Sequence, residues 1–263
     1  MITFYKLKFI EMNNKILCIA SNYGLWAEEL QAPWDALKNA GFELTLATKF
    51  GKTPLPMVIS MNVEMIDPKQ NYKVNPPEVV NRVNELLQNG DWDNPIRIED
   101  ANMNDYDAIV MVGGPGSPLD ITGNPFVHRL LLEAYQSKKV IGAICYTMAA
   151  LAQTRNPDNN NKSIIWGKKV CAHPHAWDFD SDLSYDLVNT TSNNKGTDLV
   201  TQGFVFPLQY LVEDAVGPEG TVLIDETTNR EKPCVAFDFP FVTALSVESS
   251  KAYGKLLVEI LSK

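Results

Sequence analysis

The sequence predicts an α/β protein of the flavodoxin-like, doubly wound type, with a mostly parallel sheet, helices on both faces and a lid-like insertion. Short apolar runs that suit strands buried on both faces alternate along the chain with helical patterns. Such alternation builds parallel strand–helix–strand units whose ligands bind outside the carboxyl ends of the strands. Three features predicted to follow strands, the NYG loop (22–24), the GGPG turn (113–116) and Cys145, should therefore meet at one edge of the sheet.

The first strand–helix–strand unit is predicted from residues 15–48. KILCIAS (15–21) is a short apolar run typical of a strand buried on both faces. AEELQAPWDALKNAG (27–41) places apolar residues at helical spacing and ends in glycine, a common helix stop, and FELTLAT (42–48) suits the second strand. A right-handed crossover between two parallel strands is the expected arrangement.

The same alternation resumes after a proline-rich interval. Strands are predicted at 106–114, 139–145, 168–172 and 241–246, and helices at 125–139, 146–153, 206–217 and 247–263. The helical segments carry apolar residues on one stripe, as helices packed on a sheet do.

A single domain is predicted over residues 12–263, because no Gly/Ser-rich or Pro-rich linker divides the chain. Residues 49–104 depart from the strand–helix rhythm through repeated prolines, and we interpret them as a lid or insertion within that domain. Residues 1–11 are expected to be an upstream or disordered extension, since a strand-like run begins soon after Met12.

Composition narrows the possible partners and location. The formal net charge is −9 and the basic residues are scattered, which argues against nucleic acid or an anionic membrane as a partner. No apolar stretch approaches the roughly 20 residues of a membrane helix. The four cysteines lie far apart and match no zinc-site spacing, which favours a reduced, cytoplasmic setting. We expect a small-molecule substrate and no cofactor.

Cys145 is the strongest candidate nucleophile. It stands where an apolar strand ends and a short helix begins, so that the following backbone N–H groups can stabilise an anion. The amino end of a helix also favours the thiolate over the thiol. The alternative interpretation is a buried structural cysteine, the commoner fate of a free thiol.

Six motifs in order give the chain a resemblance to a known superfamily. They are AEELQAPWDALKNAGFELTLAT, VMVGGPGSPLD, VIGAICYTMAAL, GKKVCAHPHAWD, LQYLVEDAVG and FVTALSVESSKAYGKLLVEIL. The chain resembles the ThiJ/PfpI superfamily, which includes the parkinsonism-associated deglycase and has the class I glutamine-amidotransferase-like fold. It is most similar to the larger heat-shock chaperone and glyoxalase branch.

The resemblance implies an oxidation-prone nucleophilic cysteine at Cys145 and an acidic residue that hydrogen-bonds the thiol. By alignment of AEEL this acid is Glu28, with Glu29 as the alternative. A carboxyl group in that position needs a raised pKa to donate a proton. The resemblance also implies an oxyanion site formed by the backbone N–H groups of Gly114 and Tyr146.

The chain departs from the superfamily at Tyr146, where many members carry a histidine that acts as an acid and base. A tyrosine with a pKa near 10 is a poor base at neutral pH. The HPHAWD segment (173–178) contains residues that could replace the missing histidine base. Asp178 falls where the larger branch has its acidic residue, and either His175 or His173 could serve as a base oriented by Asp178. We assign His175 and Asp178 as catalytic candidates and expect no metal, since H-x-H alone is a weak zinc signal.

Two functions follow from these residues. The first is a cysteine-dependent hydrolase or lyase acting on a small carbonyl or acyl-type substrate, as in glyoxalase III, deglycase or amidase chemistry. The second is a stress-response chaperone or redox sensor without turnover, in which Cys145 is oxidised. A glutamine amidotransferase is a weaker hypothesis, and an isonitrile hydratase-like activity stays open. A homodimer is expected by analogy with the superfamily.

Overall fold

The computed structural model of the 263-residue chain describes residues 14–67, 71–178, 182–184, 200–202 and 206–263. The extension predicted at 1–11 and residues 68–70 of the predicted lid lie outside the described residues.

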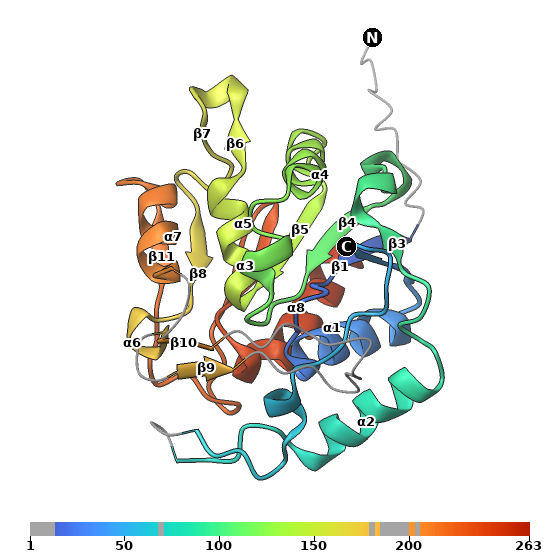
Figure 1. Cartoon of the computed structure of the whole chain (residues 1–263). Coiled ribbons are helices and arrows are strands. Elements are labelled where there is room, and N and C mark those ends of the chain that lie inside the picture. The colour runs from blue at the N-terminus through green and yellow to red at the C-terminus, as the bar shows by residue number, and fades with distance from the viewer. Residues whose placement is uncertain (1–13, 68–70, 179–181, 185–199, 203–205) are drawn as a thin grey trace.

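A seven-stranded sheet with the order β12-β13-β5-β4-β1-β2-β3 forms the centre of the fold (Figure 1). Its strands are β1 (Lys15–Ile19), β2 (Glu43–Thr48), β3 (Ile96–Arg97), β4 (Ala108–Met111), β5 (Val140–Ile144), β12 (Val235–Asp238) and β13 (Phe241–Ala244). Every neighbouring pair is parallel except β12 with β13. The prediction of a mostly parallel α/β sheet is therefore confirmed.

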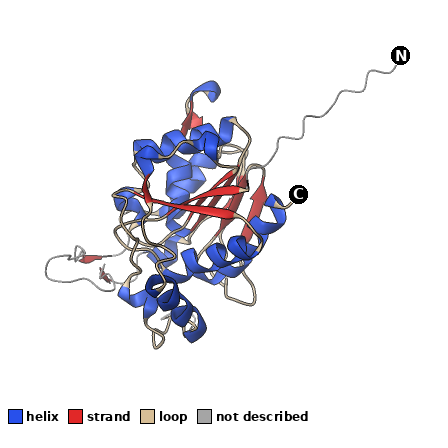
Figure 2. Cartoon of the chain, turned by 90° about the vertical axis from the view of Figure 1, so that its right-hand side faces the viewer, coloured by secondary structure: helices blue, strands red, loops and turns tan. Residues whose placement is uncertain are grey.

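Helices cover both faces of the sheet (Figure 2). The helices are α1 (Ala27–Asn39), α2 (Pro77–Gln88), α3 (Ser117–Asp120), α4 (Pro125–Gln136), α5 (Met148–Gln153), α6 (His175–Asp178), α7 (Leu208–Val216) and α8 (Ser250–Leu261). Helices α1 and α8 pack together on one face, whereas α4 and α5 pack on the other and α7 lies against α5. None of the helices in the described ranges has the length and apolar character needed to span a membrane.

Short elements connect these layers. The remaining strands are β6 (Arg155–Asn156) with β7 (Lys162–Ser163), β8 (Lys169–Cys171) with β11 (Thr221–Leu223), and β9 (Asp182–Ser184) with β10 (Val200–Gln202). Single 3-10 turns are η1 (Val58–Met61), η2 (Ile98–Asp100), η3 (Met103–Asp105), η4 (Cys145–Thr147), η5 (Pro157–Asn159) and η6 (Val247–Ser249).

Two strands have pairing partners that the alternation of strands and helices in the sequence does not predict. The strand predicted at 168–172 is present as β8, but it pairs with β11 outside the central sheet. The interval 49–104, predicted as a lid, also contributes β3 to the edge of the sheet beside β2. Both differences depend on pairing partners distant in sequence, which local apolar patterns do not specify.

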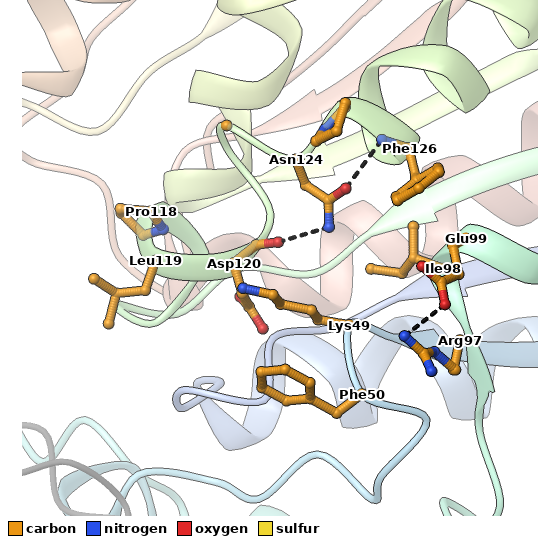
Figure 3. A pocket seen from close by; sticks show the side chains of 12 residues that line it. Lys49, Phe50, Arg97, Ile98, Glu99, Pro118, Leu119, Asp120, Asn124 and Phe126 are labelled. Carbon is orange, nitrogen blue, oxygen red and sulfur yellow. Dashed lines mark hydrogen bonds and ion pairs between the residues drawn. The ribbon is translucent and has the colours of Figure 1, made fainter.

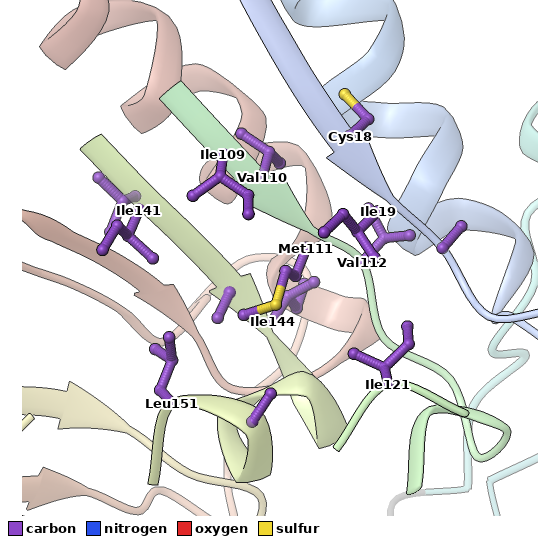
Figure 4. Close-up of a cluster of buried hydrophobic side chains, with 14 of the residues drawn as sticks. Cys18, Ile19, Ile109, Val110, Met111, Val112, Ile121, Ile141, Ile144 and Leu151 are labelled. Carbon is purple, nitrogen blue, oxygen red and sulfur yellow. The ribbon is translucent and has the colours of Figure 1, made fainter. Parts of the chain in front are cut away.

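The central strands are apolar on both faces because helices cover both. Ile109 on β4 and Ile141 on β5 are fully buried, and Figure 4 shows them among the side chains of neighbouring elements. Gly142 on β5 is required for space: a Cβ there would lie 2.4 Å from the Tyr253 hydroxyl oxygen of α8. That hydroxyl donates to the Met111 carbonyl oxygen of β4 at 3.4 Å. This close approach sets the separation between α8 and the sheet.

We expect Gly142→Ala to lower the free energy of unfolding by about 1–3 kcal/mol, because the added methyl group overpacks the contact between β5 and α8. Tyr253→Phe removes the obstructing oxygen, so the double variant should lose less stability than the two single variants together. Urea unfolding of the four proteins measures this coupling. Strict additivity, or no loss on Gly142→Ala, would contradict a close contact between Gly142 and the Tyr253 hydroxyl group.

Candidate functional site

Cys145 occupies a strained turn directly after β5. Its φ angle is +55°, in the left-handed region that residues other than glycine rarely adopt. Thr147 holds the turn closed, because its hydroxyl donates to the Ile144 carbonyl oxygen at 2.7 Å and accepts from the Ile144 N–H at 3.2 Å. This strand-to-helix elbow is the geometry that presents a nucleophile at the carboxyl end of a sheet.

The carboxyl group beside the thiol belongs to Glu29. Its carboxyl group lies beside the Cys145 side chain and the Gly113 backbone, and both lower its pKa against the larger effect of burial. Gly113 makes this approach possible, since a Cβ there would lie 2.3 Å from Glu29 Oε2 and 2.7 Å from Cys145 Cβ. The start of α1, the end of β4 and the end of β5 therefore meet at one buried contact.

The assignment of the thiol-binding acid to Glu28 is corrected by the structure. The Glu28 carboxylate instead accepts two hydrogen bonds from the Arg230 guanidinium group, at 2.6 and 2.5 Å. Successive residues of a helix point about 100° apart, so only one of the two glutamates can face the sulfur. Helical periodicity shows that both lie near the site, but the choice between them depends on where α1 packs.

Burial controls the protonation of Glu29 and Cys145. Desolvation is the main cause that raises the pKa of Glu29 to about 8, and the charges of Glu248 and Glu28 add to the shift. Desolvation, together with the negative charge of Glu29, raises the pKa of the Cys145 thiol well above its usual value. At neutral pH Glu29 therefore keeps its proton and can donate it.

Two backbone donors oppose the desolvation of the sulfur. The backbone N–H groups of Tyr146 and Gly114 lower the pKa of the Cys145 thiol and so favour its thiolate. Gly114 has a φ angle of +118°, and a Cβ there would lie 2.5 Å from the Trp26 nitrogen. Both residues predicted to form the oxyanion site thus act on the Cys145 thiol, while the catalytic use of their N–H groups stays a prediction.

Tyr146, Asp178 and His173 form a second polar group next to the elbow. The Tyr146 hydroxyl donates to Asp178 Oδ1 at 2.7 Å, and His173 Nδ1 lies 2.8 Å from the same oxygen. The Tyr146 and His173 rings also contact each other, with centroids 5.0 Å apart. Because an ionised carboxylate only accepts, Nδ1 carries the proton and Nε2 of a neutral ring keeps a lone pair, as in a histidine oriented for base catalysis.

The pairing of His175 with Asp178 is corrected to His173. His175 begins α6, and from there its ring stacks on Tyr210 of α7 at a centroid distance of 4.6 Å. Its backbone N–H donates to Gln209 Oε1 at 2.9 Å. His173 lies in the loop before the helix, where its side chain reaches the Asp178 carboxylate.

Arg230, Glu248 and Tyr72 belong to the surroundings of the site but were not found from the sequence. Arg230 Nη2 donates to the Val74 carbonyl oxygen at 2.6 Å as well as to Glu28. Glu248 accepts from the Tyr72 hydroxyl group. These contacts tie residues 72–74 of the predicted lid to the core beside α1. Arg230 stands in a loop without a recognisable motif, so only the tertiary structure reveals its role.

A cavity of about 350 Å³ lies near the same edge of the sheet (Figure 3). It is lined by residues that follow β2, by β3 and by α3 with the start of α4, and none of the residues around Cys145 lines it. Asp120 at its edge accepts a hydrogen bond from the Asn22 N–H at 2.8 Å and so fixes the NYG loop. Burial raises the pKa of Asp120 to about 6.

Within the part of the chain that the structure describes, no group of three or more His, Cys, Asp and Glu side chains is arranged to hold a metal ion.

Comparisons with known proteins show what this chain is similar to. Residues 14–178 match the model of the DJ-1/PfpI family. An uncharacterized protein of Methanocaldococcus jannaschii is 38% identical over 77 residues, which cover 29% of this chain. That match spans only 34% of the length of the curated relative.

Solved structures share the fold at low sequence identity. The Rapid Encystment Protein 24 kDa of Francisella tularensis superimposes with a TM-score of 0.66 at 21% identity, covering 94% of this chain and 98% of that chain. Glyoxalase III of Candida albicans gives a TM-score of 0.63 at 16% identity, covering 93% of this chain and 96% of that chain. DJ-1 of Schizosaccharomyces pombe gives 0.53 at 15% identity, covering 95% and 92%. At these identities the likeness shows the fold.

The rate of Cys145 alkylation by iodoacetamide should rise with pH with a midpoint near pH 8 and level off above it. Below that pH both groups of the Glu29–Cys145 pair hold their protons, and above it the pair has lost one, so that a fixed fraction carries the thiolate. In Glu29→Gln the thiolate forms only at the raised pKa of the buried thiol, which moves the midpoint upward by about one pH unit or more. Mass spectrometry of the Cys145 peptide follows the reaction, and superimposable profiles would refute the coupling.

Arg230→Leu should lower the free energy of unfolding by about 3–5 kcal/mol, because it leaves the Glu28 carboxylate buried without its partner. Adding Glu28→Gln removes that charge and should restore part of the loss. Urea unfolding of the single and double variants distinguishes the two effects. A loss below about 1 kcal/mol in Arg230→Leu would mean that solvent replaces the pair.

Proposed function

Because the chain belongs to the DJ-1/PfpI family, we propose that it is a cysteine-dependent enzyme that acts on a small carbonyl or acyl-type substrate through Cys145. The observation that carries the proposal is the arrangement at the elbow. A strained Cys145 has a protonated carboxyl group beside its sulfur and two backbone N–H groups directed at it. Structural cysteines need none of these features.

The first step uses groups that already surround the sulfur. In the singly deprotonated pair the thiolate attacks the carbonyl carbon, a carbon–sulfur bond forms, and the π electrons move to the carbonyl oxygen. The N–H groups of Gly114 and Tyr146 stabilise that oxygen as its negative charge develops. Glu29 then gives its proton to the oxygen, which leaves a hemithioacetal on Cys145 and a carboxylate on Glu29.

His173 is the proposed base for later proton transfers. Asp178 orients its ring through Nδ1, as the acid of a catalytic triad does. Tyr146 stands in the position of the usual histidine, and its hydroxyl group completes the contact with Asp178. A glyoxalase III-type isomerisation of an α-ketoaldehyde, in which a proton moves between adjacent carbons, would use such a base.

A redox sensor that works through Cys145 is the second candidate function. The Gly114 and Tyr146 N–H groups and the Glu29 acid would also stabilise the oxygen atoms of a sulfinic acid on Cys145. The raised pKa of the thiol weighs against rapid oxidation at neutral pH, because the thiolate is the reactive form. The homodimer, the cytoplasmic location and the small-molecule partner stay predictions.

Consumption of methylglyoxal and hydrolysis of an activated ester test the enzyme proposal. We expect Cys145→Ala to reduce the rate to background and His173→Ala to reduce it by about 10²–10⁴-fold. His175→Ala, which changes a neighbouring histidine outside the Asp178 contact, serves as the matched control and should change the rate little.

Equal rates in wild-type protein and Cys145→Ala would reject the enzyme proposal for these substrates. Dilute peroxide that adds one or two oxygen atoms at Cys145 alone, in a protein without turnover, would favour the sensor. A larger loss in His175→Ala than in His173→Ala would overturn the assignment of the base.

A further inference from the structure

Two cysteines outside the Cys145 site lie in direct contact. Cys171 ends β8 and Cys234 immediately precedes β12, 63 residues later in the chain, and their sulfur atoms are 3.7 Å apart. Both thiols are free. We propose that Cys171 and Cys234 form a reversible intramolecular disulfide, a redox modification site separate from Cys145.

The backbone around both residues keeps the two sulfurs together. The Cys171 N–H donates to the Thr243 hydroxyl oxygen at 3.0 Å. The Cys234 N–H donates to the Ser249 hydroxyl oxygen at 3.0 Å, and the Cys234 carbonyl oxygen accepts from the Leu245 N–H at 3.1 Å. A disulfide bond is about 2.0 Å long, so side-chain rotation has to bring the sulfurs together from van der Waals contact.

The two thiols differ in ways that suit a two-step oxidation. Cys171 is fully buried, whereas Cys234 is partly accessible to solvent and therefore to a small oxidant. Contact with the Cys171 thiol lowers the pKa of Cys234, and Lys169 and Lys232 act in the same direction against partial burial and the charge of Asp225. Cys234 is therefore the thiol that reacts first, and Cys171 is the resolving thiol.

Hydrogen peroxide is a sufficient oxidant. The Cys234 thiolate attacks one peroxide oxygen, the O–O bond breaks, and the leaving hydroxide takes a proton to become water. The Cys171 sulfur then attacks the sulfenic acid of Cys234, and a second water leaves with the thiol proton as the sulfur–sulfur bond forms. In sum, two thiols lose two electrons and two protons, and one peroxide becomes two waters.

The other two cysteines have different surroundings. Cys18 is buried within β1, where desolvation raises the pKa of its thiol to about 12. Cys145 lies beside the Glu29 carboxyl group. A disulfide between Cys171 and Cys234 can therefore be distinguished from oxidation at the nucleophile.

The position of the pair links it to the candidate site. Cys171 lies two residues before His173, which holds Asp178, and Cys234 lies four residues after Arg230, which holds Glu28. A bond between the two sulfurs would join the two segments that bring these side chains to the site. The proposal itself does not depend on the proposed enzyme activity.

The test uses the full-length chain carrying Cys145→Ser, treated with about one equivalent of hydrogen peroxide and then alkylated. We expect the intact mass to fall by about two units before alkylation, a peptide that joins Cys171 to Cys234, and full reversal by dithiothreitol. Cys18→Ala should leave the result unchanged. Cys234→Ala should abolish the cross-linked peptide, and Cys171→Ala should trap oxidation on Cys234 as a sulfenic acid or a mixed disulfide with added glutathione.

Two results would overturn the proposal. In one, both cysteines are still fully alkylated after the peroxide has oxidised a cysteine-containing peptide added to the same sample. In the other, the disulfide appears only between chains, as a dimer on a non-reducing gel whose yield rises with protein concentration. Because the readout is covalent mass, a failure of the proposed enzyme activity would not affect it.

Discussion

The contact between Glu29 and Cys145 is the constraint on which the geometry of the site depends. It requires the first turn of α1, the Gly113 turn after β4 and the elbow after β5 to approach one another without intervening side chains. Parallel strands bring their carboxyl ends to one edge of the sheet, and the missing side chain at Gly113 lets the carboxyl group reach the thiol. Burial then makes the carboxyl group a proton donor at neutral pH, a role it could not have in water.

Much of the fold could be predicted because the information is local. The apolar runs at β1, β4 and β5 and the stripes on α4 and α8 identify buried elements, and their alternation identifies the parallel sheet. The antiparallel β12 and the pairing of β8 with β11 could not be predicted in this way. Strand partners depend on long-range packing, which apolar periodicity does not encode.

In the candidate site too, local sequence patterns predict some residues, and only the packed structure identifies the others. Cys145, Gly114 and Tyr146 follow from a strand end, a glycine turn and a helix start, all visible in the sequence. The choices between Glu28 and Glu29 and between His173 and His175 depend on the rotation of a helix and on the first residue of another. A shift of one residue along a helix turns the side chain by about 100° around the helix axis. Only the packed structure therefore shows which of two neighbouring side chains faces the site.

The Asp178 carboxylate accepts from both Tyr146 and His173 through one oxygen, Oδ1. A phenol reaches farther from the backbone than an imidazole, so the distance between the elbow and the HPHAWD loop is matched to a tyrosine. A histidine at position 146 would leave a gap beside Asp178 unless the loop moved closer. Residues 146, 173 and 178 are therefore expected to change together during evolution, as one inherited unit, although the first is 27 positions from the second in the chain.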